Sequence, residues 1–207
     1  MSGEDIHEIQ HRLLGVFPLV KSFIVEGQDL VLVDTGITGG SAKAIERGLA
    51  SIGKKLSDVD LCVITHAHRD HIGGLKGLKA SGEPFLVAAH EDEADDIERG
   101  TGVGVDMRLV DGQSIGGMTV VYVPGHTLGS IALHSGDALI VGDAIAGGGD
   151  GLRPPSRSLS KDWELAKASL ANLASLDFDR VYVSHGKSVT SGGKEAMARL
   201  VAELGIG

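Results

Sequence analysis

The chain alternates between short apolar runs and longer segments of mixed polarity. The apolar runs are bounded by glycine or polar residues, which is the pattern of buried β-strands. Two runs separated by a turn around Gly27 predict a β-hairpin. The predicted strands cover residues 17–25, 30–34, 61–65, 84–89, 118–123, 138–143 and 180–184, with two further hairpin strands on either side of residues 135–137.

Other segments carry apolar residues at helical spacing. The first, residues 41–52, stops at Gly53, as helices often do. The predicted helices cover residues 41–52, 74–79, 91–99, 160–175 and 192–204. Strands and helices are interspersed over all 207 residues without a linker-like change in composition, so we expect one domain over residues 1–207.

Residues 66–71, His-Ala-His-Arg-Asp-His, follow the strand predicted at 61–65 and precede two glycines. A lone histidine on a loop is most often solvated, but four nitrogen and carboxylate donors within six residues indicate a metal site. Because side chains alternate along the run, His66 and His68 can point one way while Asp70 and His71 turn toward a second point. This cluster can therefore serve two ions.

Three more donors each stand at or just beyond the end of a predicted strand. His126 follows residues 118–123, Asp143 closes residues 138–143, and His185 follows residues 180–184. Donors placed on loops by rigid strands suit a preorganised site.

The order His-x-His-x-Asp-His, Gly-His-Thr, Gly-Asp and His-Gly resembles the metallo-β-lactamase superfamily over nearly the whole chain. Asp34, in Leu-Val-Asp-Thr-Gly, fits the superfamily's first motif. The resemblance implies an α/β fold, a four-layer αβ/βα sandwich with two mixed sheets flanked by helices.

The same resemblance implies two divalent metal ions and assigns their ligands. Asp34 would orient a ligand by hydrogen bonding, with a strand-ending turn as the alternative interpretation. Asp70 and Asp143 would take part in catalysis. Zinc is the expected metal, and iron or manganese also suits these donors. One ion would bind His66, His68 and His126, the other Asp70, His71 and His185, and Asp143 would bridge the two.

Two ions about 3.5–4 Å apart polarise a substrate oxygen and turn a bridging water into hydroxide near neutral pH. The implied function is therefore hydrolysis of an ester, lactone, thioester or lactam in a small-molecule substrate, with promiscuous β-lactamase activity as a further expectation. Two alternatives stay open. One is a mononuclear iron persulfide dioxygenase that uses His66, His126 and Asp143, and the other is a metal-bearing binding protein without turnover.

Subfamily signatures are absent. Glyoxalase II and the persulfide dioxygenases usually carry a Gly-Cys-Gly-Arg-like stretch after the bridging aspartate, and residues 143–147 lack it. The tyrosine that lactonases usually have there is absent too. The loop at 144–160 carries Arg153 and Arg157, either of which could pair with an anionic substrate group, while a solvated loop is an equal alternative.

Composition and charge limit the classes of binding partner and the cellular location that we expect for the protein. A net charge of −9, from 28 acidic and 19 basic residues, argues against nucleic acid. The single cysteine, Cys62, allows no intramolecular disulfide and is expected to be a small buried residue. No apolar run approaches the roughly 18 residues of a membrane span, and the first twenty residues do not resemble a secretion signal, so we expect a cytoplasmic protein.

Some polar residues have simpler interpretations than metal binding. His90 and the acids of 91–96 could pass for another metal site, but acids in a first helical turn interact favourably with the helix dipole. Structural or solvated roles are expected for His7, His11 and His134. The oligomeric state is left open by the sequence.

Overall fold

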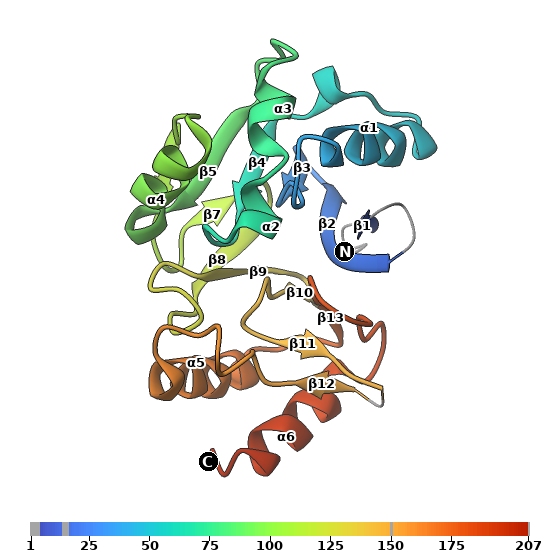
Figure 1. Ribbon diagram of the computed structural model, residues 1–207. Helices are drawn as coiled ribbons and strands as arrows, with labels where there is room; N and C mark the ends of the chain where they lie inside the picture. The colour runs from blue at the N-terminus through green and yellow to red at the C-terminus, as the bar shows by residue number, and fades with distance from the viewer. Residues whose placement is uncertain (1–4, 14–16, 150, 207) are drawn as a thin grey trace. The chain divides into compact units, whose positions relative to one another are not determined.

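The computed structural model describes residues 5–13, 17–149 and 151–206. The chain forms two compact units, Glu4–Leu109 and Val110–Gly207, which we call the N-terminal and C-terminal units. Figure 1 shows the elements of each unit. The single domain expected from the sequence stays a prediction.

The N-terminal unit contains a mixed six-stranded sheet in the order β1-β2-β3-β4-β5-β6. The first three strands pair antiparallel, and the pairs from β3 to β6 are parallel. Both β3 and β4 are buried along their whole length, as their apolar sequences predict. The strands are β1 (Asp5–Leu13), β2 (Phe17–Glu26), β3 (Leu30–Val33), β4 (Leu61–Ile64), β5 (Leu86–His90) and β6 (Met107–Leu109).

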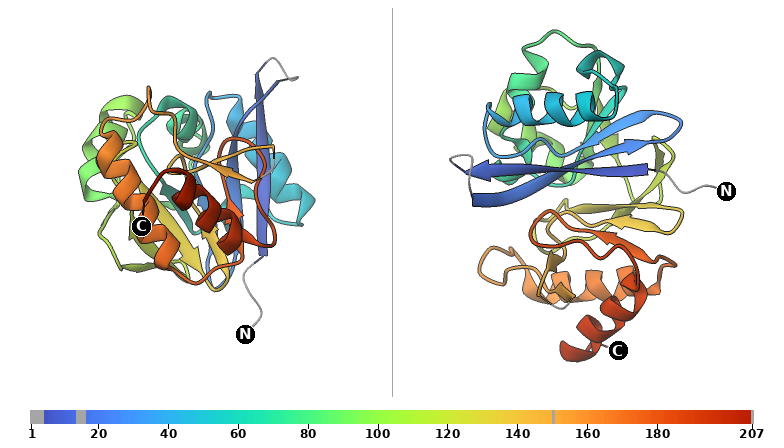
Figure 2. Two further views of the ribbon diagram at one scale, coloured as in Figure 1. Left: turned by 90° about the horizontal axis from the view of Figure 1, so that it is seen from below. Right: turned by 90° about the vertical axis from the view of Figure 1, so that its right-hand side faces the viewer.

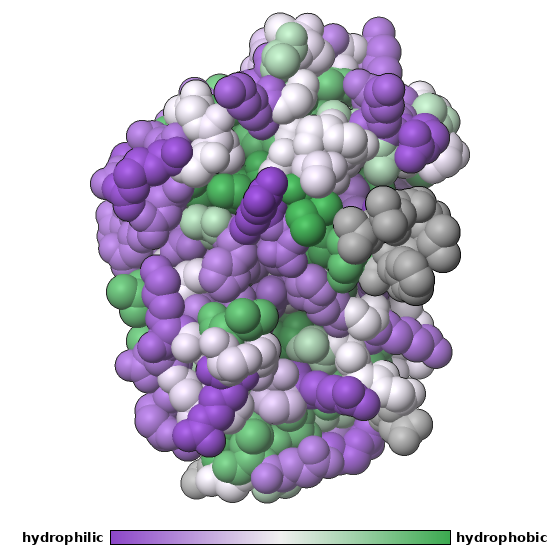
Figure 3. Space-filling view, in the orientation of Figure 1, coloured by the Kyte–Doolittle hydropathy of each residue, from purple (hydrophilic) through white to green (hydrophobic). Residues whose placement is uncertain are grey.

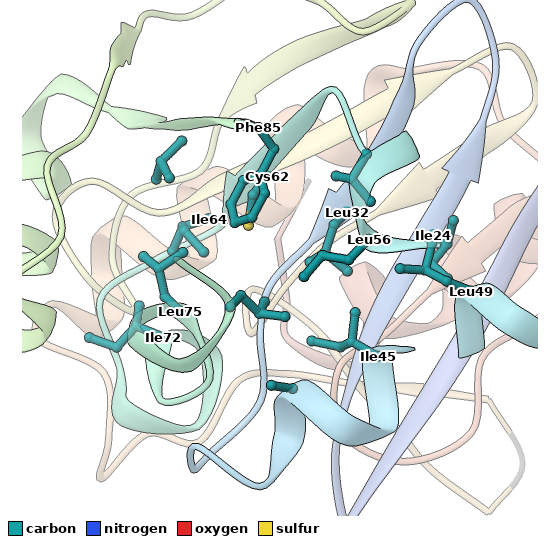
Figure 4. Packing of buried hydrophobic residues seen from close by; sticks show 14 of the residues in the cluster. Ile24, Leu32, Ile45, Leu49, Leu56, Cys62, Ile64, Ile72, Leu75 and Phe85 are labelled. Carbon is teal, nitrogen blue, oxygen red and sulfur yellow. The ribbon is translucent and has the colours of Figure 1, made fainter. Parts of the chain in front are cut away.

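Helices of this unit cover one face of its sheet (Figures 1 and 2). Their apolar stripes join the strands in one core: Ile45 and Leu49 of the first helix belong to the same buried cluster as Leu32 (Figure 4). The helices are α1 (Ser41–Ser51), the 3₁₀ turn η1 (Leu56–Asp58), α2 (Arg69–Ile72), α3 (Leu75–Lys79) and α4 (Glu91–Thr101).

The C-terminal unit contains a second mixed sheet, in the order β13-β10-β9-β8-β7. Only the β10–β13 pair is parallel. The strands are β7 (Ser114–Ile115), β8 (Met118–Tyr122), β9 (Ile131–Ser135), β10 (Ala138–Ile140) and β13 (Arg180–Tyr182), and a separate small hairpin is formed by β11 (Ala146–Gly147) and β12 (Leu152–Arg153).

Two helices, α5 (Trp163–Ser175) and α6 (Gly193–Glu203), complete this unit. Leu170 of α5 and Met197 of α6 are fully buried and belong to one cluster with Leu139 of β10. Each unit therefore has its own hydrophobic core.

Most predicted elements are present, with several differences. The short strands β6, β7, β11 and β12 and the turn η1 were not predicted, and β11 and β12 lie within the segment 144–160 that was predicted as a loop. The strand β1 was not predicted, and its pairing with β2 extends the sheet. The donor run predicted as a loop becomes helical at Asp70 and His71, which lie in α2. The helix predicted from residue 160 begins at Trp163, because the carboxylate of Asp162 accepts the amide of Leu165 and caps it.

None of the helices in the described ranges combines the length and apolarity needed to cross a bilayer.

Cys62 of β4 provides a test of this core. The side chain is fully buried in the same cluster as Phe85 (Figure 4), and burial raises the pKa of its thiol above the usual range. We expect a thiol reagent to react with the native protein at pH 8 at least about a thousandfold more slowly than with urea-unfolded protein, because the strand must open first. Equal rates in the two states would contradict this packing.

Candidate metal centre

In the N-terminal unit, the candidate donors follow neighbouring parallel strands. Asp34 comes directly after β3, and the run that begins with Thr65 and His66 comes directly after β4. Carboxyl ends of parallel strands meet at one edge of a sheet, where sites in α/β proteins lie. The ring of His66 lies 4.0 Å from that of His71 and 4.8 Å from that of His68, measured between centroids. The three histidines therefore form one compact group.

Asp34 is completely buried and fixes the orientation of His71. Its Oδ2 accepts a hydrogen bond from His71 Nδ1 at 2.7 Å, and its Oδ1 accepts one from the Thr65 amide at 2.8 Å. A histidine that donates through Nδ1 presents Nε2 as a lone-pair donor, which is the form that binds metals. The Nε2 atom of His71 lies 3.9 Å from Oδ2 of Asp70.

The hydroxyl of Thr65 links the same carboxylate to a second histidine, His66. This hydroxyl donates to Asp34 Oδ2 at 2.8 Å and lies 3.1 Å from Nδ1 of His66. Because the hydroxyl proton is directed to the carboxylate, the hydroxyl oxygen accepts from His66 Nδ1–H. In this tautomer His66 would present its Nε2 atom to a metal ion. The role of Thr65 was missed from sequence, because nothing in the chain places it beside Asp34.

Glu93 was also missed. It is 1% exposed, and its Oε1 accepts the amide of Ala67 at 2.7 Å, which holds the backbone between His66 and His68. The acids around it were explained by the helix dipole, but Glu93 shares the buried face of α4 with Ile97. Its spacing of four residues from Ile97 places both side chains on one face of a helix, and this was the signal in the sequence that Glu93 is buried.

Glycines explain how α2 comes so close to the loop after β3. A Cβ on Gly73 would lie 2.1 Å from the carbonyl oxygen of Ile37, and one on Gly74 would lie 2.1 Å from that of Thr35. The amide and hydroxyl of Thr35 also donate to the carbonyl of His71, at 2.7 and 2.8 Å. Backbone packing and hydrogen bonds thus fix the position of α2.

In the C-terminal unit, β8, β10 and β13 run in the same direction, and each is followed by a candidate donor. These are His126, Asp143 and His185. The Nε2 atoms of both histidines lie 3.4 Å from the same oxygen, Oδ2 of Asp143. Both distances exceed the usual length of an N–H···O hydrogen bond.

The two distances have a direct chemical interpretation. Two atoms bound about 2.0–2.1 Å from one tetrahedral zinc ion lie about 3.3–3.4 Å from each other. The oxygen of Asp143 therefore stands at ligand-to-ligand distance from both His126 and His185. A carboxylate shared by two ions would have this arrangement.

The loop of His126 is fixed by its neighbours. Gly125 has a φ of +130°, and a Cβ there would lie 2.2 Å from the amide nitrogen of Ala166 in α5. The hydroxyl of Ser130 accepts the Thr127 amide at 3.0 Å, so side-chain bonds shape this loop. His126 is consequently held at 2% exposure.

The remaining histidines have local partners. Burial, with a smaller effect of His71, lowers the pKa of His11 to about 4, and its Nε2 lies 2.7 Å from the Ser22 hydroxyl. His7 lies 2.9 Å from Glu26 Oε1, and His134 Nε2 lies 2.8 Å from the carbonyl of Asp177. His90 caps α4, because its Nδ1 accepts the amide of Asp92 at 3.2 Å.

The two arginines of the loop at 144–160 have different surroundings. The guanidinium of Arg157 lies over the ring of Trp163, 5.6 Å from its centroid. The side chain of Arg153 packs over Gly148, where an added Cβ would meet its Nε at 2.6 Å. Arg157 therefore has a packing role in the C-terminal unit.

Comparison with known proteins identifies the family. The sequence model of the metallo-beta-lactamase superfamily matches residues 18–185. The chain belongs to this superfamily. Among solved structures, it resembles a metallo-β-lactamase family protein from Thermus thermophilus with a TM-score of 0.72, at 21% identity over 97% of this chain and 79% of that one. A metallo-β-lactamase from Cronobacter sakazakii gives a TM-score of 0.71 at 20% identity, over 97% of this chain and 93% of that one. These likenesses confirm the expected fold class.

Curated relatives of this superfamily member include hydroxyacylglutathione hydrolases. That of Alkalilimnicola ehrlichii is 37% identical over 70% of this chain and 54% of its own length. That of Dechloromonas aromatica is 30% identical over 78% of this chain and 56% of its own length. The chain thus spans about half the length of the curated relatives it matches.

The network around Asp34 predicts a large effect of its removal. Asp34→Ala leaves the donors of Thr65 and His71 buried without their acceptor, so we expect the free energy of unfolding to fall by about 3 kcal/mol or more. Urea unfolding monitored by circular dichroism measures the change. Asp177→Ala, which removes an exposed carboxylate, is the control and should stay within about 0.5 kcal/mol of the native protein. Equal stability of the two variants would contradict the assigned network.

Proposed function

We propose that the protein is a metal-dependent hydrolase that cleaves a thioester or a related ester, lactone or lactam. The observation that carries this proposal is the position of Asp143 Oδ2, 3.4 Å from the Nε2 atoms of both His126 and His185. Membership of the superfamily and the names of the curated relatives support it. Among the acyl bonds, the relatives favour a thioester.

The donor set fits two divalent ions. Imidazole and carboxylate suit zinc, iron and manganese, and the buried thiol of Cys62 is not among the donors. We assign His66, His68 and His126 to one ion, Asp70, His71 and His185 to the other, and Asp143 to both, as the resemblance implies. Such ions, when bound, polarise the acyl oxygen and lower the pKa of water.

The chain's own residues preorganise this chemistry. Asp34 holds His71 in the tautomer that presents Nε2, and Thr65 does the same for His66. Both histidines are at most 1% exposed, so water competes little for their positions. Ligands held in this way lose little conformational entropy when a metal binds.

The substrate's thiol part is left open by this proposal. Residues 143–147 lack the Gly-Cys-Gly-Arg-like stretch that glyoxalase II usually carries. We therefore expect thioester hydrolysis without a strict requirement for glutathione.

Metal analysis tests the ligand assignment. We expect two zinc ions per chain in protein purified without chelator. Asp143→Ala should lose most of both, because it removes the shared ligand, whereas His185→Ala should retain about one. His134→Ala is the control and should retain two, since that side chain bonds the carbonyl of Asp177. Two ions retained in Asp143→Ala would overturn the assignment.

Assays on a thioester, a lactone, nitrocefin and a phosphodiester test the activity. We expect the thioester to be hydrolysed fastest, chelator to abolish turnover, and Asp143→Ala to lower kcat/KM at least about a hundredfold. Circular dichroism confirms that the variant is folded. One iron per chain with oxygen consumption would replace the hydrolase by the dioxygenase, and bound metal without turnover on any substrate would indicate a binding protein.

A further inference from the structure

A groove of about 600 Å³ lies beside the donor loop of the N-terminal unit. Its lining includes Ala67, which stands between His66 and His68 in the sequence, and Arg69, which precedes Asp70. The groove therefore borders the segment that carries the candidate ligands of this unit. Other lining residues come from α2, α3, the end of α4 and the loop after β3.

In the described part of the chain, two cations and no carboxylate line this groove. Arg69 and Lys76 are both exposed, and none of the described lining residues is acidic. Within the described ranges, no ion pair is formed by either cation. Both positive charges therefore face the groove without an internal counterion among the described residues, in a chain that has 28 acidic and 19 basic residues.

Some cations elsewhere in the chain do have acidic partners. The Nζ atom of Lys21 lies 3.1 Å from Oε1 of Glu8, and the Nη2 atom of Arg180 lies 2.6 Å from Oδ1 of Asp137. Two cations at a groove with no acidic lining favour a negatively charged ligand there over a neutral one. Such a site attracts and orients an anionic group.

The groove also offers apolar contacts. Ile37, Ile72 and Ala67 contribute to its lining. Figure 3 shows hydrophobic and hydrophilic surface side by side over α2. A ligand that has a short apolar part and an anionic end matches this combination.

We propose that this groove binds the anionic end of the substrate, with Arg69 and Lys76 as specificity-determining residues. This inference rests on the proposed function and narrows it to acyl compounds that carry a carboxylate or a phosphate. The two cations act in binding and take no part in bond cleavage. Their effect is therefore on KM for anionic substrates.

A matched pair of thioesters tests the proposal. S-butanoyl-3-mercaptopropionate is anionic, whereas S-butanoyl-N-acetylcysteamine is neutral. In the double variant Arg69→Ala/Lys76→Ala we expect KM for the anionic thioester to rise about a hundredfold, roughly tenfold for each cation removed. KM for the neutral thioester and kcat for both should stay within about twofold.

The control is Lys43→Ala/Arg47→Ala, which removes two exposed cations of α1 that do not line the groove. It should leave KM for the anionic thioester within about twofold. An unchanged KM in the Arg69→Ala/Lys76→Ala protein, or an equal rise in the control, would overturn the proposal.

A binding measurement separates this proposal from the hydrolase assignment. The thioether 3-(butylthio)propionate has no bond to hydrolyse, and its binding can be followed by NMR titration even if no thioester is turned over. We expect binding to be lost in the Arg69→Ala/Lys76→Ala protein and kept in the control. The proposed anion site would be overturned if the thioether bound neither the native protein nor the control. It would also be overturned if the native protein, the control and the Arg69→Ala/Lys76→Ala protein bound the thioether equally well.

Competition distinguishes the two anions. Butyl phosphate and butanoate are compared as inhibitors of thioether binding at equal concentration. Stronger inhibition by one of them identifies the preferred anionic group, while inhibition by neither contradicts an anion site.

Discussion

The N-terminal part of the candidate site depends on one buried carboxylate. Asp34 has a φ of +60°, a left-handed conformation that costs about 1 kcal/mol for most residues but is tolerated by Asp and Asn. Burying its charge without partners would cost far more. Hydrogen bonds from Thr65 and His71 offset both costs. The conformation, the charge and the orientation of two histidines are therefore coupled, and none can change alone.

Strand direction explains why candidate donors from separate segments of the chain lie at the same edge of each sheet. In the N-terminal unit, parallel pairing of β3 with β4 sets Asp34 and His66 at the same edge. In the C-terminal unit, β8, β10 and β13 run in one direction although β9 intervenes, so three separate loops emerge at one edge. The glycines beside the donors then allow backbones to approach closely, as at Gly73 and Gly125. The fold supplies the positions, and the loops need only the right residue types.

The sequence predicted the features that depend on local pattern. Apolar runs located the central strands, and residue type at strand ends indicated the candidate donors, because both signals lie within a few consecutive residues. It did not predict Thr65 or Glu93 as positioning residues, since their partners lie 31 and 26 residues away. Nor did it predict α2, because a four-residue helix is set by contacts such as those from Thr35 rather than by periodicity. The positions of these residues and of α2 depend on tertiary contacts, which a local sequence pattern does not show.

The two histidines beside Asp143 differ in their exposure to solvent. Its Oδ2 lies 3.4 Å from Nε2 of both histidines, yet the side chain of His126 is 2% exposed and that of His185 is 37% exposed. The buried histidine is fixed by a loop that α5 and Ser130 hold in place, so its position is set before any ligand arrives. The half-buried side chain of His185 is the more accessible of the two to solvent. One carboxylate oxygen thus lies at the same distance from a histidine held by its loop and from a more accessible one, and under the proposed function the two would differ in how far they move when an ion binds.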